Sequence, residues 1–240
     1  MRTQRFIALL ALLLAAAPRL AAQGEIANLM SFDSKQVHLG IQVGYTSAKF
    51  DLTYSEDDEV RQQIQGTTSY FKPGFHIAAI GDLHLGRFFD LRFLPGVTFL
   101  TRNLEYSWAP AARATTPNAE DWRTVESIYG DLPFEFKFRA MRYGNYRPYL
   151  TAGVCYGFDF SSLRKNRNAN RESIVKLNAS DFRYTVGAGF DVFLYYIKFA
   201  IELKMSFGLM DLSLPDNEIY ARTVDNLISR TFMLSFTFEG

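Results

Sequence analysis

Large apolar residues and polar residues alternate along eight stretches of this chain. In residues 132–138 every second residue is Leu or Phe, and the residues between them are Pro133, Glu135 and Lys137. Successive side chains of a β-strand point to opposite faces, so a period of two predicts strands with one apolar and one polar face. The eight predicted strands cover residues 36–45, 74–85, 89–99, 131–139, 150–160, 181–192, 198–209 and 231–238.

The length of these stretches and the position of their charges indicate the fold class. Most reach the roughly 9–11 residues that a strand needs to cross a bilayer, whereas ordinary strands average about 5–6. The charges gather on the polar face, and a charge facing lipid near the midplane costs about 2–4 kcal/mol. The pattern therefore predicts an all-β fold, an eight-stranded antiparallel transmembrane β-barrel of the outer-membrane type, over residues 35–240. The alternative is a periplasmic lipocalin-like barrel or sandwich, but the apolar face is too uniformly bulky to fit inside a small barrel.

The connections between the predicted strands also follow the outer-membrane pattern. With the N-terminus in the periplasm, the outer connections are residues 48–69, 107–123, 161–178 and 210–226, which are long and polar. The inner connections, around residues 86–87, 143–145 and 194–196, are short, as periplasmic turns are in such barrels. Aromatic residues near the strand ends predict interfacial girdles: Tyr45, Tyr70, Tyr106, Trp108, Tyr149, Tyr195 and Tyr196.

The first residues have the features of a targeting segment. Arg2 and Arg5 precede an apolar run over residues 6–17, which is shorter than the roughly 20 residues of a membrane-spanning helix. Small residues follow at Ala21 and Ala22, as at a cleavage site. We expect a cleaved signal peptide at residues 1–22 and a short periplasmic segment at residues 23–34. An N-terminal membrane anchor is the alternative.

Composition narrows the classes further. The 240 residues are 48% hydrophobic and 21% charged, which excludes a disordered chain. Cys155 is the single cysteine, so no internal disulfide and no cysteine-rich metal site can form. The formal net charge of +1 gives no reason to expect nucleic acid as a partner. We expect no cofactor.

The polar face predicts a charged lumen. We call its charged residues the lumen charge network: Asp82, His84, Asp90, Arg92, Glu135, Lys137, Arg139, Arg183, Asp191, Lys198, Glu202 and Lys204. Eight strands enclose an interior that side chains roughly fill. The network is therefore interpreted as a packed set of salt bridges that keeps the barrel rigid, with a narrow polar conduit as the alternative. Either way the barrel is too narrow to pass a folded polypeptide.

Two hairpins predict specific charge pairs. A three-residue turn centred on Arg87 places Asp82 opposite Arg92, and His84 opposite Asp90. A second, two-residue turn at residues 194–195 places Asp191 opposite Lys198.

Candidate chemistry is sparse. The histidines, His38, His76 and His84, all fall on the lumen face, and His38 and His84 lie near the inner mouth. Together with Asp82 or Asp90, the two inner-mouth histidines could bind a metal or transfer protons. Their spacing matches no ligand motif, so no catalytic, metal or cofactor residues are predicted and we expect no enzymatic activity. An outer-membrane lipid-modifying enzyme is the alternative.

Two outer connections carry opposite charges. The first is acidic, with Glu56, Asp57, Asp58 and Glu59. The third is basic and is a possible partner-contact loop, with Arg164, Lys165, Arg167, Arg171 and Lys176. These loops could close over the mouth, or the basic loop could contact lipopolysaccharide or a partner protein; the alternative is that both are simply solvated.

Several segments resemble a known family. They are His38-Leu39-Gly40-Ile41, Phe89-Asp90-Leu91-Arg92-Phe93-Leu94-Pro95-Gly96, Leu132-Pro133-Phe134-Glu135-Phe136-Lys137 and Arg147-Pro148-Tyr149-Leu150-Thr151-Ala152-Gly153. Together they resemble the PorT family of outer-membrane barrels from the Bacteroidetes, over nearly all of the mature chain.

This resemblance implies a non-enzymatic accessory component of the type IX (Por) secretion system. That system exports cargo proteins that carry a C-terminal domain, including gingipain-type proteases, and it serves motility in gliding relatives. The implied partners are outer-membrane lipid, lipopolysaccharide and other secretion components, with the large Sov/SprA translocon barrel as the conduit. The alternative is a small structural or adhesive barrel without a secretion role.

Overall fold

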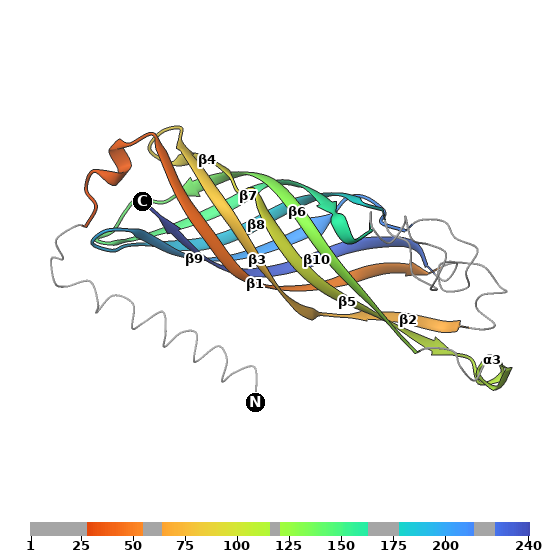
Figure 1. The fold of residues 1–240 in the computed structure, drawn as a ribbon. Helices are drawn as coiled ribbons and strands as arrows, with labels where there is room; N and C mark the ends of the chain where they lie inside the picture. Colours follow the sequence, from red (N-terminus) through yellow and green to blue (C-terminus); the bar gives the residue numbers. More distant parts are fainter. Residues whose placement is uncertain (1–27, 55–63, 116–120, 163–177, 214–223) are drawn as a thin grey trace, which may run out of the picture.

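The strands of the chain wind around a common axis and close into a barrel (Figure 1). The computed structural model describes residues 28–54, 64–115, 121–162, 178–213 and 224–240. The strands are β1 (Val37–Tyr54), β2 (Ile64–Tyr70), β3 (Lys72–His84), β4 (Phe89–Phe93), β5 (Gly96–Trp108), β6 (Trp122–Arg139), β7 (Tyr146–Asp159), β8 (Ser180–Phe193), β9 (Lys198–Gly208) and β10 (Val224–Glu239). The helical turns η2 (Phe32–Ser34) and α3 (Pro110–Thr115) lie outside the wall.

The ten described strands form a ring of eight, in which every neighbouring pair is antiparallel. Around the ring, β1 pairs with β10, then come β9, β8, β7 and β6, and β3 returns to β1. Between β6 and β3, β4 and β5 share one position, because both pair with each of these two strands. Likewise β2 and β3 share one position, because both pair with β5. Closure leaves no free sheet edge in the membrane, where unpaired backbone groups would be costly. The predicted fold class is confirmed.

Pro95 lies between β4 and β5, which end at Phe93 and begin at Gly96. A proline has no backbone N–H to donate to a neighbouring strand. The ladder continues around it, since the carbonyl of Pro95 accepts from the N–H of Ala79 and the N–H of Leu94 donates to the carbonyl of Pro133. The wall therefore stays closed at the interruption.

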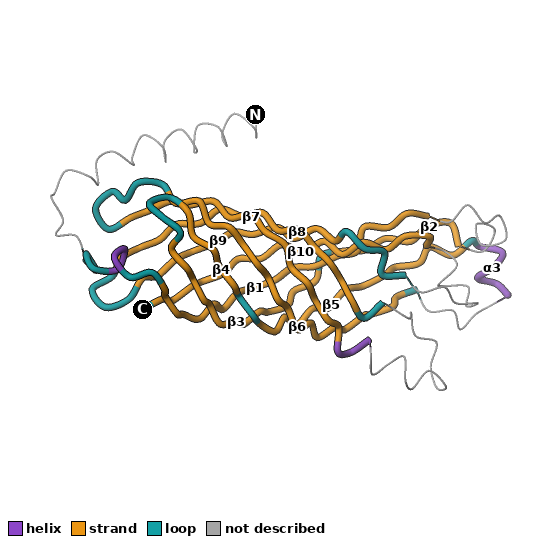
Figure 2. The backbone as a smooth tube through the Cα atoms, turned by 90° about the horizontal axis from the view of Figure 1, so that it is seen from above, coloured by secondary structure: helices purple, strands orange, loops and turns teal. Residues whose placement is uncertain are grey.

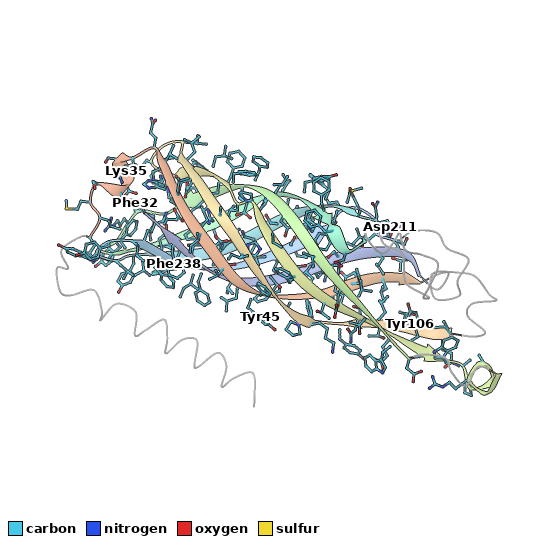
Figure 3. The ribbon with its side chains drawn as sticks, in the orientation of Figure 1. Phe32, Lys35, Tyr45, Tyr106, Asp211 and Phe238 are labelled. Atoms are coloured by element: carbon cyan, nitrogen blue, oxygen red, sulfur yellow. The ribbon has the colours of Figure 1, made fainter. Side chains whose placement is uncertain are left out.

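The inside and outside of the wall are as the alternation predicts. Phe134 and Phe136 on β6 point outward and are 52% and 58% exposed, while Glu135 and Lys137 between them are buried in the lumen. Stick side chains cover the outer surface of the barrel wall in Figure 3. The apolar face therefore meets lipid and the charged face turns inward.

The barrel has one end with short connections and one end with long ones. The short connections, residues 85–88, 140–145 and 194–197, lie at the same end as the C-terminus and the N-terminal segment 28–36 (Figures 1 and 2). The opposite end carries β2 and α3. Because outer-membrane barrels have short periplasmic turns and longer extracellular loops, we assign the first end to the periplasm. We call the two ends the inner and the outer end.

The strands at the outer end extend further than expected. The predicted connection at residues 48–69 is largely strand, since β1 continues to Tyr54 and β2 begins at Ile64. Likewise, β6 begins at Trp122 and contains 18 residues, more than a membrane crossing needs. The prediction was wrong because the alternation continues there with its sense reversed, and polar residues face outward.

One of the two predicted hairpin registers is confirmed. Asp82 lies opposite Arg92 in the β3–β4 pair, and His84 lies opposite Asp90. The prediction for the β8–β9 hairpin was wrong, since Lys198 lies opposite Phe193, not opposite Asp191. The turn is centred one residue later than expected, because the N–H of Leu194 donates to the carbonyl of Ile197. Moving a turn by one residue moves each cross-strand partner by two.

Some predictions lie outside the described residues. The signal peptide at residues 1–22 is one of them, and so are the charged residues of the acidic and basic loops. Within the described part of the chain, none of the helices has the length and apolar character needed to span a membrane.

Candidate functional site

The lumen charge network lies inside the barrel, and its central contacts run from one wall to the other. Arg92 on β4 donates from Nη1 to Oε2 of Glu202 on β9 at 2.7 Å, and both side chains are fully buried. Lys204 on β9 donates from Nζ to Oε1 of Glu135 on β6 at 2.6 Å and lies 3.0 Å from Oε1 of Glu202. Because an isolated buried charge costs several kcal/mol, these four groups depend on one another.

Two further ion pairs extend the network toward the inner end. Lys137 on β6 donates to Asp191 on β8 at 2.9 Å between Nζ and Oδ1. Lys198 on β9 lies 2.6 Å from Oε2 of Glu239, its register partner on β10. The last strand is thereby tied to its neighbour by an ion pair as well as by the backbone ladder.

Tyr149 belongs to the lumen, not to an aromatic girdle. Its side chain is buried, and its hydroxyl donates to Oε2 of Glu202 at 3.0 Å. The ammonium of Lys137 lies 3.8 Å from the centre of its ring. The ring lies against Gly189, where a Cβ would be 2.2 Å from a ring carbon. Glycine at position 189 therefore leaves space for the ring of Tyr149. The alternation also predicts that Tyr149 faces the lumen, because its neighbour Leu150 faces outward.

Toward the outer end the polar contacts centre on two arginines. Arg183 donates to Asp131 and also to Sγ of Cys155 at 3.3 Å. Cys155 is buried. Arg102, which is not among the predicted residues of the lumen charge network, is fully buried and donates to Oγ of Ser127 at 2.7 Å. The alternation of β5 could have identified Arg102 as a lumen residue, because Arg102 lies on the same face as Thr98.

A small cavity remains in the middle of the lumen. Its volume is about 30 Å³, and Gln42, His76, Asp131, Glu135 and Lys204 are among its lining residues. That space holds about one or two water molecules. Side chains therefore fill most of the lumen at this level.

His38 and His84 meet at the inner mouth, with their ring centres 4.6 Å apart. Nδ1 of His84 lies 2.9 Å from Oδ1 of Asp90 and 3.7 Å from Oδ1 of Asp82. This cluster has the donor atoms of a metal site. However, Nε of Arg139 already lies 2.8 Å from Oδ2 of Asp90, and the charge of this arginine disfavours a metal ion beside it. The geometry fits an ion-pair network better than a metal centre.

The N-terminal segment, residues 28–36, lies at the inner mouth (Figure 3) and contacts several parts of the barrel. Phe32 is 4% exposed and stacks on the ring of His38 with ring centres 3.7 Å apart. Its edge packs against Phe193, and the ammonium of Lys198 lies 4.7 Å from its ring centre. Asn28 donates from its backbone N–H to Oδ1 of Asn145 at 2.8 Å. The described part of the predicted periplasmic segment is thus bound to the barrel.

Asp33 fixes this segment electrostatically. Its carboxylate accepts two hydrogen bonds from Arg147, at 2.9 and 2.5 Å, and lies 3.3 Å from Nη1 of Arg139. Burial works against ionisation of Asp33, but the hydrogen bonds and charges of the two arginines outweigh it and hold the pKa of Asp33 below its usual value. The carboxylate is therefore charged at any neutral pH.

An apolar core fills the outer end of the barrel. We call it the outer apolar cluster; its buried residues are Phe50, Ile64, Leu104, Tyr106, Val125, Leu212 and Leu227. Tyr106 is therefore another residue that the girdle prediction misplaced. Leu212 comes from the connection after β9, and Asp211 fixes it by accepting from the N–H groups of Ser213 and Leu227, each at 2.9 Å. These hydrogen bonds outweigh burial and hold the pKa of Asp211 below its usual value.

Comparison with known proteins gives a family. Residues 21–214 match the family described as "Outer membrane protein beta-barrel domain". The chain belongs to this outer-membrane β-barrel family. Its location is therefore the outer membrane, with strands crossing the bilayer, and the prediction of the location is confirmed.

The chain is also similar to several solved structures. OprG from Pseudomonas aeruginosa is 15% identical, with 86% of this chain and 97% of that chain covered and a TM-score of 0.46. Neisserial surface protein A is 11% identical over 85% and 98% of the two chains, with a TM-score of 0.43. Ail, the attachment invasion locus protein of Yersinia pestis, is 12% identical over 86% and 100%, with a TM-score of 0.38. No curated protein sequence matches this chain.

Proposed function

We propose that this barrel is a non-enzymatic accessory component of the type IX secretion system, required for export of C-terminal-domain cargo such as gingipain-type proteases. The observation that carries the proposal is the filled lumen. Arg92 and Lys204 bridge opposite walls through Glu202 and Glu135, so a polypeptide has no path through the barrel. A secretion role then has to be exerted from the ends and the outer wall, while a larger barrel conducts the cargo.

The resemblance to PorT supplies the secretion system, and three of its four segments form one patch of wall; the fourth, at residues 38–41, lies on β1. Residues 89–96 and 132–137 are neighbours in the β4–β6 ladder, where Arg92 lies opposite Glu135. Residues 147–153 follow on β7, where Thr151 lies opposite Lys137. The resembling residues therefore include Arg92 and Glu135 from the centre of the lumen charge network, and Arg147, which binds Asp33.

The proposed partners are outer-membrane lipid, lipopolysaccharide and other secretion components, above all the large Sov/SprA translocon barrel. The wall carries many exposed aromatic and aliphatic side chains, which suit both lipid and the wall of another barrel. Affinity isolation of the tagged protein from native membranes tests this. We expect a large partner barrel to co-purify.

The secretion role is tested by deleting the gene and following C-terminal-domain cargo. We expect cargo to accumulate in the periplasm of the deletion strain and to disappear from the medium, and a plasmid copy should restore export. Normal export in the deletion strain would disprove the proposal.

The second candidate is a structural or adhesive surface barrel, and the outer apolar cluster favours it. Strands that continue past the membrane around a core including Phe50, Leu104 and Val125 hold the extracellular connections on a rigid base. Under this candidate, deletion changes surface binding and leaves the secreted proteins intact. The two outcomes separate the candidates in one strain.

The absence of catalysis is tested at the inner-mouth histidines. The double variant His38→Gln/His84→Gln removes imidazole chemistry and keeps polar side chains. We expect it to complement the deletion as well as the unchanged protein does, provided that equal amounts of folded barrel are present. Loss of function with normal folding would favour the lipid-modifying enzyme instead.

A further inference from the structure

A basic pocket opens at the inner end of the barrel, beside the N-terminal segment. Its volume is about 530 Å³, and it lies between this segment and the connections at residues 85–88 and 140–145. Its charged lining consists of His84 together with Asp33, Lys35, Arg87, Arg139, Arg142 and Arg147. Lys35 marks this end in Figure 3. Five permanent cations therefore face a single carboxylate in the lining.

The cations of the pocket fall into two groups. Arg139 and Arg147 are buried and are already paired with Asp33. Lys35 and Arg87, by contrast, have no carboxylate within 4 Å among the residues that the structure describes. These two side chains are available for an anion that comes from outside the chain.

Arg142 is held in place without a neutralising partner of its own. Its guanidinium donates to the backbone carbonyls of Asn28 and Gly144, the latter at 2.8 Å, and lies 3.8 Å from the ring centre of Phe193. No described carboxylate lies within ion-pair distance of it. Its Nη2 also donates to Oδ1 of Asn145 at 3.2 Å, whereas no hydrogen bond from Nη1 is seen among the described residues. The N–H groups of Nη1 can therefore contact a phosphate, which a positioned guanidinium suits.

One side of the pocket is apolar and continues into the lipid-facing wall. Phe88 and Met141 line the pocket and are 37% and 66% exposed. The ring of Phe138 lies 6.5 Å from that of Phe88 and 5.2 Å from that of Phe89, and both Phe138 and Phe89 face outward. A ligand with a charged head and a hydrocarbon tail can therefore use both surfaces at once. A free anion or an acidic peptide has no use for the apolar side.

We propose that this pocket binds the headgroup of an anionic phospholipid from the periplasmic leaflet. The phosphate lies between Lys35, Arg87 and Arg142, and the acyl chains run along Phe88, Phe89 and Phe138. Basic recesses at the membrane surface recognise acidic headgroups in this way. The site does not depend on the proposed role in secretion.

The test measures lipid binding to the full mature barrel in detergent. Native mass spectrometry follows dioleoyl phosphatidylglycerol and dioleoyl phosphatidylcholine titrated onto the protein. We expect the anionic lipid to bind at least tenfold more tightly, which corresponds to about 1.4 kcal/mol or more. Equal affinity for the two lipids would overturn the proposal.

A pair of matched variants locates the site. Lys35→Gln/Arg87→Gln removes two cations for which no hydrogen bond to the barrel is seen, and we expect about a tenfold loss of phosphatidylglycerol affinity. Lys72→Gln/Arg113→Gln removes the same two residue types from the outer half of the chain and should leave affinity unchanged. Equal losses in both variants would overturn the proposal. Heat-modifiable migration on gels shows that each variant is folded, and Arg142→Gln provides an independent third variant.

Two competitors distinguish the source of the anion. If inorganic phosphate displaces the lipid as strongly as dihexanoyl phosphatidylglycerol does, the acyl chains contribute nothing and the assignment to a lipid is wrong. If hexaglutamate binds more tightly than the lipid, the pocket is a site for an acidic protein segment and the proposal is overturned. We expect both competitors to be weaker than the short-chain lipid.

Discussion

The middle and the outer end of this barrel solve the same packing problem with opposite chemistry. In the middle, the lumen holds charges such as Arg92 and Glu202 while Phe134 faces outward. At the outer end, Leu104 fills the interior while Thr124 is exposed on β6. The strands run through both regions without a change in period. What changes is the solvent: lipid surrounds the middle, so apolar groups face out, and water surrounds the outer end, so they face in.

The comparison implies that the two interiors lose stability for different reasons. The charged interior suffers when one partner is removed, because the remaining charge stays buried without compensation. The apolar interior suffers when volume is removed, because a cavity forms. The predictions below use these differences, beginning with the largest expected effect.

The largest effect is expected from Arg92→Met. This change leaves Glu202 and Glu135 with one cation fewer in the middle of the lumen, and a broken buried pair costs about 3–5 kcal/mol. Urea unfolding of the protein in lipid vesicles measures the loss. Arg230→Met is the matched control, because Arg230 pairs with Asp51 in a partly exposed position and such pairs contribute about 0–1 kcal/mol. Similar losses in the two variants would contradict the comparison.

A somewhat smaller loss is expected from Leu104→Ala in the outer apolar cluster. Leu104 is 1% exposed, and truncating a buried leucine costs about 2–5 kcal/mol. The same urea titration measures it. Leu150→Ala is the control, because Leu150 lies 58% exposed on the lipid-facing wall and leaves no cavity. If both variants unfold at the same urea concentration, the outer end has no core of its own.

A lysine scan along one face of β6 locates the border between the regions. Phe134→Lys places a charge against lipid near the middle of the membrane, which costs about 2–4 kcal/mol. Thr124→Lys changes the same face nearer the start of the strand, where we expect water and a cost of about 0–1 kcal/mol. Unfolding in vesicles again supplies the measurement. A large cost at position 124 would place the border further out than the change in polarity indicates.

The smallest effect concerns the attachment of the N-terminal segment. Because the pKa of Asp33 is below its usual value of 3.8, its ion pairs contribute fully above that pH and are lost as the pH falls through the lower, folded-state value. We expect hydrogen exchange in residues 28–36 to rise only in strongly acidic solution, and Asp33→Asn to raise it by a few-fold at pH 7. An unchanged exchange rate in the variant would show that the ion pairs of Asp33 do not hold the segment.

The alternation was enough to predict the membrane-embedded part of the fold. It gave the eight ring positions, the direction of Phe134 and Glu135, and the Asp82–Arg92 register, because a period of two fixes both the face and the pairing of a strand. The alternation did not predict the outer ends of the strands, where apolar residues face inward and polar residues face outward. It also misplaced the β8–β9 turn, since residues 194–197 contain no glycine that would fix the turn type.

The contacts within the lumen could not be predicted in the same way. Arg92 lies beside Asp82 in register but bonds to Glu202 across the barrel, and that choice depends on barrel diameter and strand tilt. The packing of Phe32 on His38 could not be predicted either, because residues 28–36 show no alternation. The lumen position of Tyr149 could have been predicted, since its neighbour Leu150 was assigned to the outer face.

The N-terminal segment also has a consequence for the order in which the chain folds. Asn28 bonds to Asn145 and to the carbonyl of Phe193, which lie 117 and 165 residues further along the chain. The earliest residues of the described chain thus have a binding surface only after β8 has taken its place. Their attachment is therefore a late event in biogenesis. Protection of residues 28–36 from protease would indicate that the barrel of that molecule is fully assembled.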